Sequence, residues 1–213
     1  MIIGSFNNLN MTTEFEIIQK AFPSEVQEEL NSLLTRFEIE TKHSTIRFEE
    51  TIVGKEFIQI PSRIYYNPPY SLVDSKFTQI EKEILSCIYS RHHNGFIRQK
   101  AIMNTIHSDN YWTTPYIVKI IGEYVIEILN DINNNFGTIN KTNLILFIQK
   151  NPEFYNRICS RVESYWDCYY RYQFPKKLNN IKVTGKLRYV GFQLLDKIDE
   201  LISQYENDIS VIR

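Results

Sequence analysis

The fold of this chain is decided by residues 94–132, which read NGFIRQKAIMNTIHSDNYWTTPYIVKIIGEYVIEILNDI. Two apolar patterns of helical spacing follow each other in it, one over 97–106 and one over 117–132, with polar residues 108–110 between them. Apolar side chains that recur every three or four positions predict helices that bury one face. We therefore expect a helical hairpin whose second helix is long, has Pro115 in its first turn, and lies at the centre of the core.

The composition is that of an ordinary globular protein. The 213 residues are enough for one well-buried core, and 43% hydrophobic with 23% charged residues exclude a wholly disordered chain. No run approaches the roughly 18 apolar residues that cross a bilayer, and the first residues lack a basic region ahead of an apolar segment. The three cysteines form no CxxC pair, which indicates reduced, packed thiols. We therefore expect a cytoplasmic protein without a membrane partner.

We expect a single, mainly α-helical domain over residues 1–213 with a small N-terminal β-hairpin. A first helix is predicted from Ser24, which follows Pro23 and precedes Gln27 at a capping-box spacing. The predicted parts are a polar leader (1–12), a β-hairpin insertion (45–66), helical hairpins (75–149) and aromatic and basic C-terminal helices (151–206).

The β-hairpin is predicted from a change of period. From Thr45 onward apolar and polar side chains alternate, and Gly54-Lys55 supplies a turn to a second run that ends at Pro61, since proline cannot donate to a ladder. The alternating residues are Ile46, Phe48 and Ile52 on one side and Arg47, Glu49 and Thr51 on the other.

The helical hairpins over 75–149 are similar in length and joined by short polar loops. Residues 94–101, NGFIRQKA, resemble the signature that opens the second helix of a HEAT repeat. This signature consists of a short residue, then Val-Arg, then Ala. The start Pro115-Tyr116-Ile117-Val118 is similar to the first helix of a following unit. This resemblance implies that Arg98 is a packing residue that reaches a polar group of a neighbouring unit. A solenoid core usually needs three units and no third copy is found, so an irregular helical bundle stays open as the alternative.

Charge is distributed unevenly along the chain, although the net charge is only −1. Residues 13–58 hold ten acidic and five basic side chains, whereas residues 155–188 hold eight basic and two acidic ones. Such a split indicates either differently solvated faces of one domain or an end that attracts an anionic partner.

A predicted helix over 152–172 carries the strongest pattern of a binding site. Its predicted packed face consists of Tyr155, Ile158, Val162, Tyr165, Tyr169 and Tyr172. Beside this face, seven residues are candidates for contact with a partner: Arg157, Arg161, Trp166, Tyr170, Arg171, Lys176 and Lys177. Arginine interleaved with aromatic residues is typical of protein interfaces and of nucleic-acid contacts, and equally of an aromatic core with a solvated face.

Two binding functions follow from this pattern. The first is a non-catalytic protein-interaction or scaffold module, of a regulatory or immunity type, with a protein as its partner. The alternative is a nucleic-acid-binding module that uses helix 152–172 and the basic loop 175–188, although an overall pI of 6.4 is unusual for a nucleic-acid binder. The oligomeric state is left open.

Catalysis is the second alternative, with a cleft around Glu123 and His92 or His93. Adjacent histidines on a helix point about 100° apart and chelate one metal poorly, so we expect no metal and no cofactor. The pair is expected to end a helix, with Gly95 as a left-handed exit. Glu123 follows Lys119 by four residues, which predicts a solvent-exposed ion pair on the long helix; the alternative, if that helix is central, is a partly buried Glu123 with a functional role.

Overall fold

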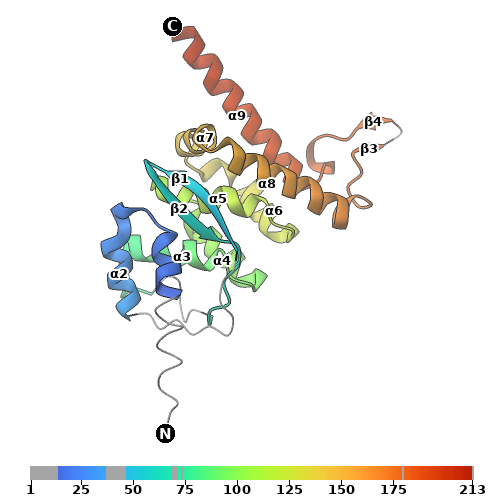
Figure 1. The fold of residues 1–213 in the computed structure, drawn as a ribbon. Coiled ribbons are helices and arrows are strands. Elements are labelled where there is room, and N and C mark those ends of the chain that lie inside the picture. The colour runs from blue at the N-terminus through green and yellow to red at the C-terminus, as the bar shows by residue number, and fades with distance from the viewer. Residues whose placement is uncertain (1–13, 37–46, 69–71, 73, 179, 213) are drawn as a thin grey trace. The chain divides into compact units, whose positions relative to one another are not determined.

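The computed structural model describes residues 14–36, 47–68, 72, 74–178 and 180–212. The predicted leader 1–12 and the first two residues of the predicted hairpin lie outside the described residues. The described chain is mainly helical with a small antiparallel sheet near its N-terminal end, as predicted (Figure 1). Its contacts form two compact units, one up to Tyr116 and one from Ile117 onward. The single domain, and the choice between a HEAT-like array and a bundle, remain predictions.

Residues 14–20 are helical and precede the named elements of the first unit. These elements are η1 (Ser24–Val26), α2 (Gln27–Arg36), β1 (Phe48–Val53), β2 (Glu56–Pro61), α3 (Gln79–Tyr89), α4 (Gly95–Thr105) and η2 (Tyr111–Thr113). Helix α5 (Thr114–Ile121) spans the boundary between the units. The second unit continues with α6 (Ile126–Asn134), η3 (Phe136–Thr138), α7 (Lys141–Lys150), α8 (Pro152–Tyr165), η4 (Trp166–Tyr170), β3 (Lys177–Leu178), β4 (Ile181–Lys182), η5 (Gly185–Leu187) and α9 (Val190–Ile212).

An aromatic cluster holds the start of the described chain against the end of the first unit. The ring of Phe22 stacks on Tyr116 at 5.4 Å and meets Trp112 edge-on at 5.8 Å. The Tyr116 hydroxyl donates to the Ala21 carbonyl at 2.6 Å, so its polar end is satisfied inside the core. Residues about 90 positions apart in sequence are thereby fixed to each other, which makes this core dependent on long-range contacts.

The β-hairpin is confirmed, but its inner face is the one that carries polar residues. The buried side chains of β1 are Glu49, Thr51 and Val53, whereas Phe48 is exposed. The register explains this choice, because Ile58 pairs with Thr51 and Ile60 pairs with Glu49, and partners across an antiparallel ladder lie on the same face. The two isoleucines of β2 are fully buried and bring the polar residues of β1 inward with them.

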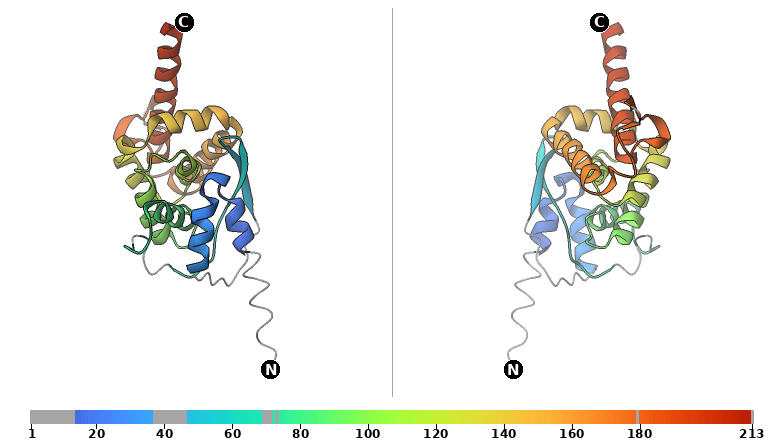
Figure 2. Two further views of the ribbon diagram at one scale, coloured as in Figure 1. Left: turned by 90° about the vertical axis from the view of Figure 1, so that its left-hand side faces the viewer. Right: turned by 90° about the vertical axis from the view of Figure 1, so that its right-hand side faces the viewer.

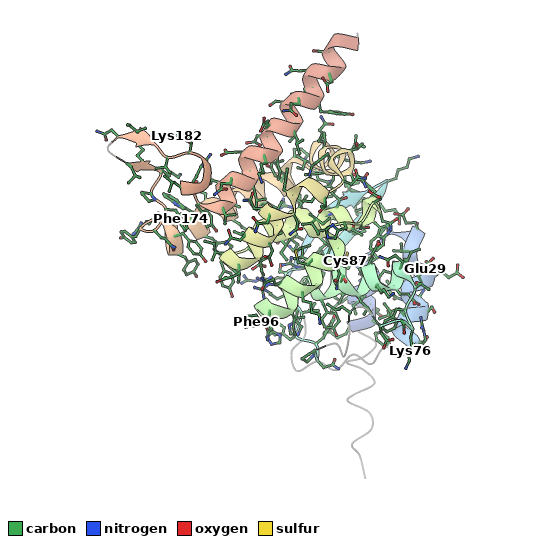
Figure 3. The ribbon with its side chains drawn as sticks, turned by 180° about the vertical axis from the view of Figure 1, so that it is seen from behind. Glu29, Lys76, Cys87, Phe96, Phe174 and Lys182 are labelled. Carbon is green, nitrogen blue, oxygen red and sulfur yellow. The ribbon has the colours of Figure 1, made fainter. Side chains whose placement is uncertain are left out.

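Helices α3 and α4 form the hairpin predicted from residues 75–107, but the turn between them differs from the prediction. Gly95 is the first residue of α4, and its φ is not positive, so the predicted left-handed exit is wrong. The Asn94 side chain instead accepts the backbone N–H of Phe96 and caps α4, which starts the helix at this point. Figure 3 shows Phe96 on the outside of the helix, while Cys87 of α3 lies inside.

Arg98 organises the same turn from the inside. Its side chain is 1% exposed, and Nη1 donates to the backbone carbonyls of His92 at 2.8 Å and His93 at 2.9 Å. A guanidinium group is suited to this task because it donates several hydrogen bonds in a fixed geometry. Arg98 is therefore a packing residue whose hydrogen bonds close the turn directly before its own helix.

The predicted long helix over 114–132 is wrong, because it is interrupted after Ile121. The N–H groups of Gly122 and Glu123 bond three residues back, to Lys119 and Ile120, which tightens and ends α5. Helix α8 packs close to this turn, since a Cβ at Gly122 would lie 3.4 Å from side-chain carbons of Arg161 and Ile158, an ordinary contact distance. Glycine thus ends a helix that hydrophobic periodicity alone extends.

The predicted solvent-exposed pair Lys119 and Glu123 is also wrong. Both side chains are buried, at 1% and 2% exposure, within the second unit. The Lys119 ammonium lies 6.0 Å from the centre of the Phe154 ring, which is the distance of a cation–π contact. Lys119 is therefore buried within α5, and Glu123 is buried in the turn that follows it.

Substitution of Arg98 by alanine tests the turn between α3 and α4. The substitution removes two hydrogen bonds from a charged donor and leaves the His92 and His93 carbonyls without that donor. We therefore expect the free energy of unfolding to fall by about 3 kcal/mol. Denaturation in urea measures the change. Lys100→Ala, an exposed position on the same helix, is the control and is expected to change stability by less than about 0.5 kcal/mol. Equal effects of the two substitutions would contradict the role given to Arg98.

Substitution of Gly191 by alanine tests the packing of α9 on α8. A Cβ at Gly191 would lie 2.6 Å from a ring carbon of Tyr189 and 2.8 Å from a methyl carbon of Val162. We expect this overpacking to lower the free energy of unfolding by about 1–3 kcal/mol. Gly137→Ala is the matched control, because no heavy atom lies within 4 Å of a Cβ at that position. A wild-type unfolding curve for Gly191→Ala would show that α9 is packed differently.

Candidate functional site

A π-helical turn changes which aromatic residues of the predicted helix 152–172 face inward. Helix α8 ends at Tyr165, and η4 continues it with π-helical geometry over Trp166–Tyr170. The predicted packed face is buried at Tyr155, Ile158 and Val162. A π turn bonds each residue five positions back and so fits an extra residue into the turn, which shifts every later side chain around the axis.

The last two tyrosines of the predicted packed face, one in the π turn and one directly after the helix, are exposed. Tyr169 is 64% exposed and Tyr172 is 88% exposed. Their exposure corrects the prediction that both belong to the core. The sequence gives no signal for this change, because the spacing of the apolar residues over 155–172 fits a regular α-helix throughout.

Trp166 and Tyr170, predicted as partner contacts, are half-buried and hold the unit together. The Trp166 indole donates to the Phe174 carbonyl at 2.8 Å. The Tyr170 hydroxyl donates to the Tyr124 carbonyl at 2.6 Å, and its ring stacks on Tyr189 at 5.0 Å. Burial raises the pKa of Tyr170, so the hydroxyl stays protonated as a donor. These two side chains fix η4 to the α5–α6 turn and to the start of α9.

Three of the predicted basic residues also contact their own unit. Lys176 pairs with Glu163 and places its ammonium 4.4 Å from the centre of the Trp166 ring. The guanidinium of Arg157 lies 5.7 Å from the Phe154 ring, and the half-buried side chain of Arg161 packs next to Gly122. These contacts make the three residues part of the folded unit, whatever else they bind.

Arg171 is exposed and is presented together with an exposed aromatic ring. Its guanidinium lies 4.9 Å from the centre of the Tyr172 ring and bonds the Tyr172 hydroxyl and the Asp167 carboxylate, each at 3.1 Å. The arrangement offers a planar cation and an aromatic face side by side, which suits both protein interfaces and stacked bases.

The hairpin of β3 and β4 supplies a surface that the sequence analysis did not identify. Lys177 pairs with Lys182, and Leu178 pairs with Ile181. Since cross-strand partners share a face and neighbouring pairs alternate, one face of the hairpin is basic and the other is apolar. Leu178 is 52% exposed and Ile181 is 73% exposed. Asn180, with a φ of 66°, lies in the turn that connects the pairs.

We name residues 169–182 the exposed basic segment. It contains four basic residues and no acidic one. Figure 1 shows its hairpin reaching away from the helices α8 and α9, and Figure 3 shows Lys182 near its end. Four of the seven predicted partner contacts lie in this segment: Tyr170, Arg171, Lys176 and Lys177. Tyr170 is half-buried and Lys176 pairs with Glu163, so Arg171 and Lys177 are the two that the structure leaves most open to a partner. The Asn-Asn pair between two Lys-bearing runs is the sequence signal by which the hairpin is detectable.

Both histidines of the catalytic alternative make contacts within the folded chain. His92 is 1% exposed; its Nε2 lies 2.9 Å from the Tyr66 carbonyl and its Nδ1 accepts the Asn94 N–H at 3.0 Å. One donating and one accepting nitrogen define a neutral imidazole with both positions occupied. His93 is exposed and stacks on Tyr65 at 5.3 Å.

The structure does not assemble Glu123 with either histidine within one unit, because the histidines belong to the first unit and Glu123 to the second. Within the described part of the chain, no three His, Cys, Asp or Glu side chains are placed to hold a metal ion. The three cysteines, at positions 87, 159 and 168, are free. No helix among the described residues is long and apolar enough to span a bilayer.

A comparison of the chain with protein-family models, with curated proteins and with solved structures found no match.

Substitution of His92 by glutamine tests the neutral state of the buried imidazole. Burial lowers the pKa of His92 from its ordinary value of 6.5, so on acidification the unfolded chain takes up a proton before the folded chain does. Stability is therefore lost as the pH falls below 6.5, and this contribution is absent above it. We expect the unfolding free energy of the wild type to drop more steeply than that of His92→Gln between about pH 7.5 and pH 5.5. Parallel pH profiles in urea denaturation would contradict a neutral, buried His92.

Proposed function

We propose that this protein is a non-catalytic interaction module that binds a protein partner through the exposed basic segment. The observation that carries the proposal is the exposure of four large apolar side chains in one short basic stretch. They are Tyr169, Tyr172, Leu178 and Ile181. Water-exposed apolar groups at this density favour association, because a partner that covers them removes apolar surface from water.

The aliphatic pair favours protein over nucleic acid as the partner. Leu178 and Ile181 present branched, non-aromatic side chains, which stack poorly on bases but fill an apolar pocket. The lysines on the opposite face of the hairpin favour a partner that carries carboxylates around such a pocket. The partner supported by these features is a protein surface with an apolar pocket and an acidic rim.

Nucleic-acid binding is the second candidate, and a specific observation favours it as well. Arg171 and Tyr172 present a cation and an aromatic face together, and the exposed basic segment has no acidic residue to repel phosphate. Single-stranded nucleic acids bind to such combinations of cationic and aromatic groups. Under this candidate the lysines dominate the affinity and the aliphatic pair contributes little.

The two candidates are separated by capture from the native cells, with and without nuclease, followed by mass spectrometry and an absorbance spectrum. For a protein partner we expect capture to survive nuclease. Leu178→Ala with Ile181→Ala should weaken it by about tenfold or more, as should Tyr172→Ala. For nucleic acid, binding is lost with moderate salt and with Lys177→Glu plus Lys182→Glu, while the aliphatic substitutions have little effect.

Matched controls are available in the first unit. Phe96→Ala removes an aromatic side chain that is 83% exposed, and Lys100→Glu reverses an exposed charge. Both are expected to leave capture unchanged. Loss of capture in the controls to the same extent as in the segment variants would contradict a binding site at the exposed basic segment.

A further inference from the structure

The far end of helix α9 is a second exposed surface, with the opposite charge. Figures 1 and 2 show α9 running on beyond the other helices of its unit. Ile198 is fully buried, but from Asp199 to Ser210 no described side chain of α9 is buried. A helix of this length that leaves its last turns without a packed face gains little there from tertiary contacts.

The sequence of this end has the pattern of a helix that docks. Residues 199–212, which we name the acidic end of α9, contain four acidic residues and neither lysine nor arginine. Ile202 and Tyr205 are half-buried apolar residues spaced by three, and the sequence continues the apolar spacing with Ile209 and Ile212. Apolar residues at alternating spacings of three and four form a narrow stripe along one side of a helix.

The acidic end of α9 and the exposed basic segment complement each other in charge. The first contains four acidic residues and neither lysine nor arginine, and the second contains four basic residues and no acidic one. Because the lysines and the apolar pair lie on opposite faces of the hairpin, a docked helix would meet the lysine face. In the described part of the chain, the charged groups of Lys177, Lys182, Glu206 and Asp208 take part in no hydrogen bond or ion pair. Each surface therefore carries unneutralised charge of the sign that the other lacks.

The two surfaces of one chain are kept apart by the helix between them. A helix rises 1.5 Å per residue, so Glu206 lies about 24 Å along the axis from Val190, where α9 begins. The hairpin is attached at that beginning, because Tyr189 stacks on Tyr170 and the Val183 N–H bonds the Lys176 carbonyl. The acidic end can therefore meet a basic segment only on another molecule.

We propose that a second copy of this chain is a partner of the exposed basic segment, and that it binds through the acidic end of its α9. The same contact made in both directions closes a dimer with twofold symmetry. The inference rests on the proposed function, since it takes the exposed basic segment as a protein-binding surface and names an acidic amphipathic helix as the kind of partner that it binds.

Sedimentation of the purified 213-residue chain tests the dimer. We expect the fraction of dimer to rise over roughly two decades of protein concentration in the micromolar range, and we expect salt to weaken the dimer. Lys177→Glu with Lys182→Glu reverses the basic side, and Glu206→Lys with Asp208→Lys reverses the acidic side. Each double variant alone should lose about tenfold or more in self-association.

Mixing the two double variants provides the decisive measurement. In the mixed pair each reversed hairpin faces a reversed α9 and each native hairpin faces a native α9, so both contacts regain opposite charges. We expect the mixture to dimerise at concentrations where either variant alone is monomeric. Glu153→Lys, an exposed charge reversal on α8, is the control and should leave the dimer unchanged.

Other outcomes overturn the inference without touching the proposed function. A chain that stays monomeric throughout, or a mixture that fails to dimerise, would show that a copy is not the partner. A dimer that survives both charge reversals but is lost in Ile202→Asp would show that α9 pairs with α9 as a coiled coil. In each case capture of another protein that is lost in Leu178→Ala with Ile181→Ala still supports the exposed basic segment as a binding site.

Discussion

The hydrogen bond from the Tyr170 hydroxyl to the Tyr124 carbonyl fixes the part of the second unit from which the exposed basic segment projects. Tyr170 reaches this carbonyl because the π-helical turn brings its side chain inward, where its ring also stacks on Tyr189. One side chain thus joins the α5–α6 turn, η4 and the start of α9. Tyr169 lies in the same π-helical turn and is exposed, so this turn presents one tyrosine to solvent while it anchors the next one against the unit.

Hydrophobic periodicity predicted the helices whose ends are set locally. Helix α3 begins with a capping box of Thr78 and Glu81, and α4 begins with the Asn94 cap, so short-range chemistry was sufficient to place them. The prediction of one long helix over 114–132 was wrong, because the apolar spacing continues through residues 122–125 whereas the backbone leaves the helix there. The inner face of the β-hairpin was likewise decided by cross-strand register rather than by the alternation along β1.

The residues of the candidate site were predicted in part, but the direction in which their side chains point was not. The basic residues and tyrosines were visible in the sequence, but the assignment of inward and outward faces assumed an uninterrupted α-helix. The α-helix changes to a π-helical turn at Trp166, and the spacing of residues in the sequence does not indicate this change. The apolar pair Leu178 and Ile181 was overlooked because each strand of that hairpin is only two residues long, which is too short to show a period.

Buried polar side chains in the first unit show why residue type alone points poorly to chemistry. Glu83 is 6% exposed and accepts hydrogen bonds from Ser108, Asn110 and Gln79. His92 is likewise bonded at both ring nitrogens. A buried group whose hydrogen-bonding capacity is filled by its own fold specifies that fold and has no remaining site for a substrate.

The pairing of Lys177 with Lys182 has a thermodynamic consequence for recognition. Two like charges directly across a ladder oppose the folded hairpin, and a ladder of four residues has little to offset them. A carboxylate placed between the two ammonium groups relieves that repulsion, so ligand binding and hairpin formation stabilise each other. The apparent affinity for any acidic ligand then scales with the fraction of molecules in which the hairpin is already formed. Ionic strength acts on this fraction as well as on the contact itself, in opposite directions: screening favours the free hairpin and weakens its attraction for the ligand.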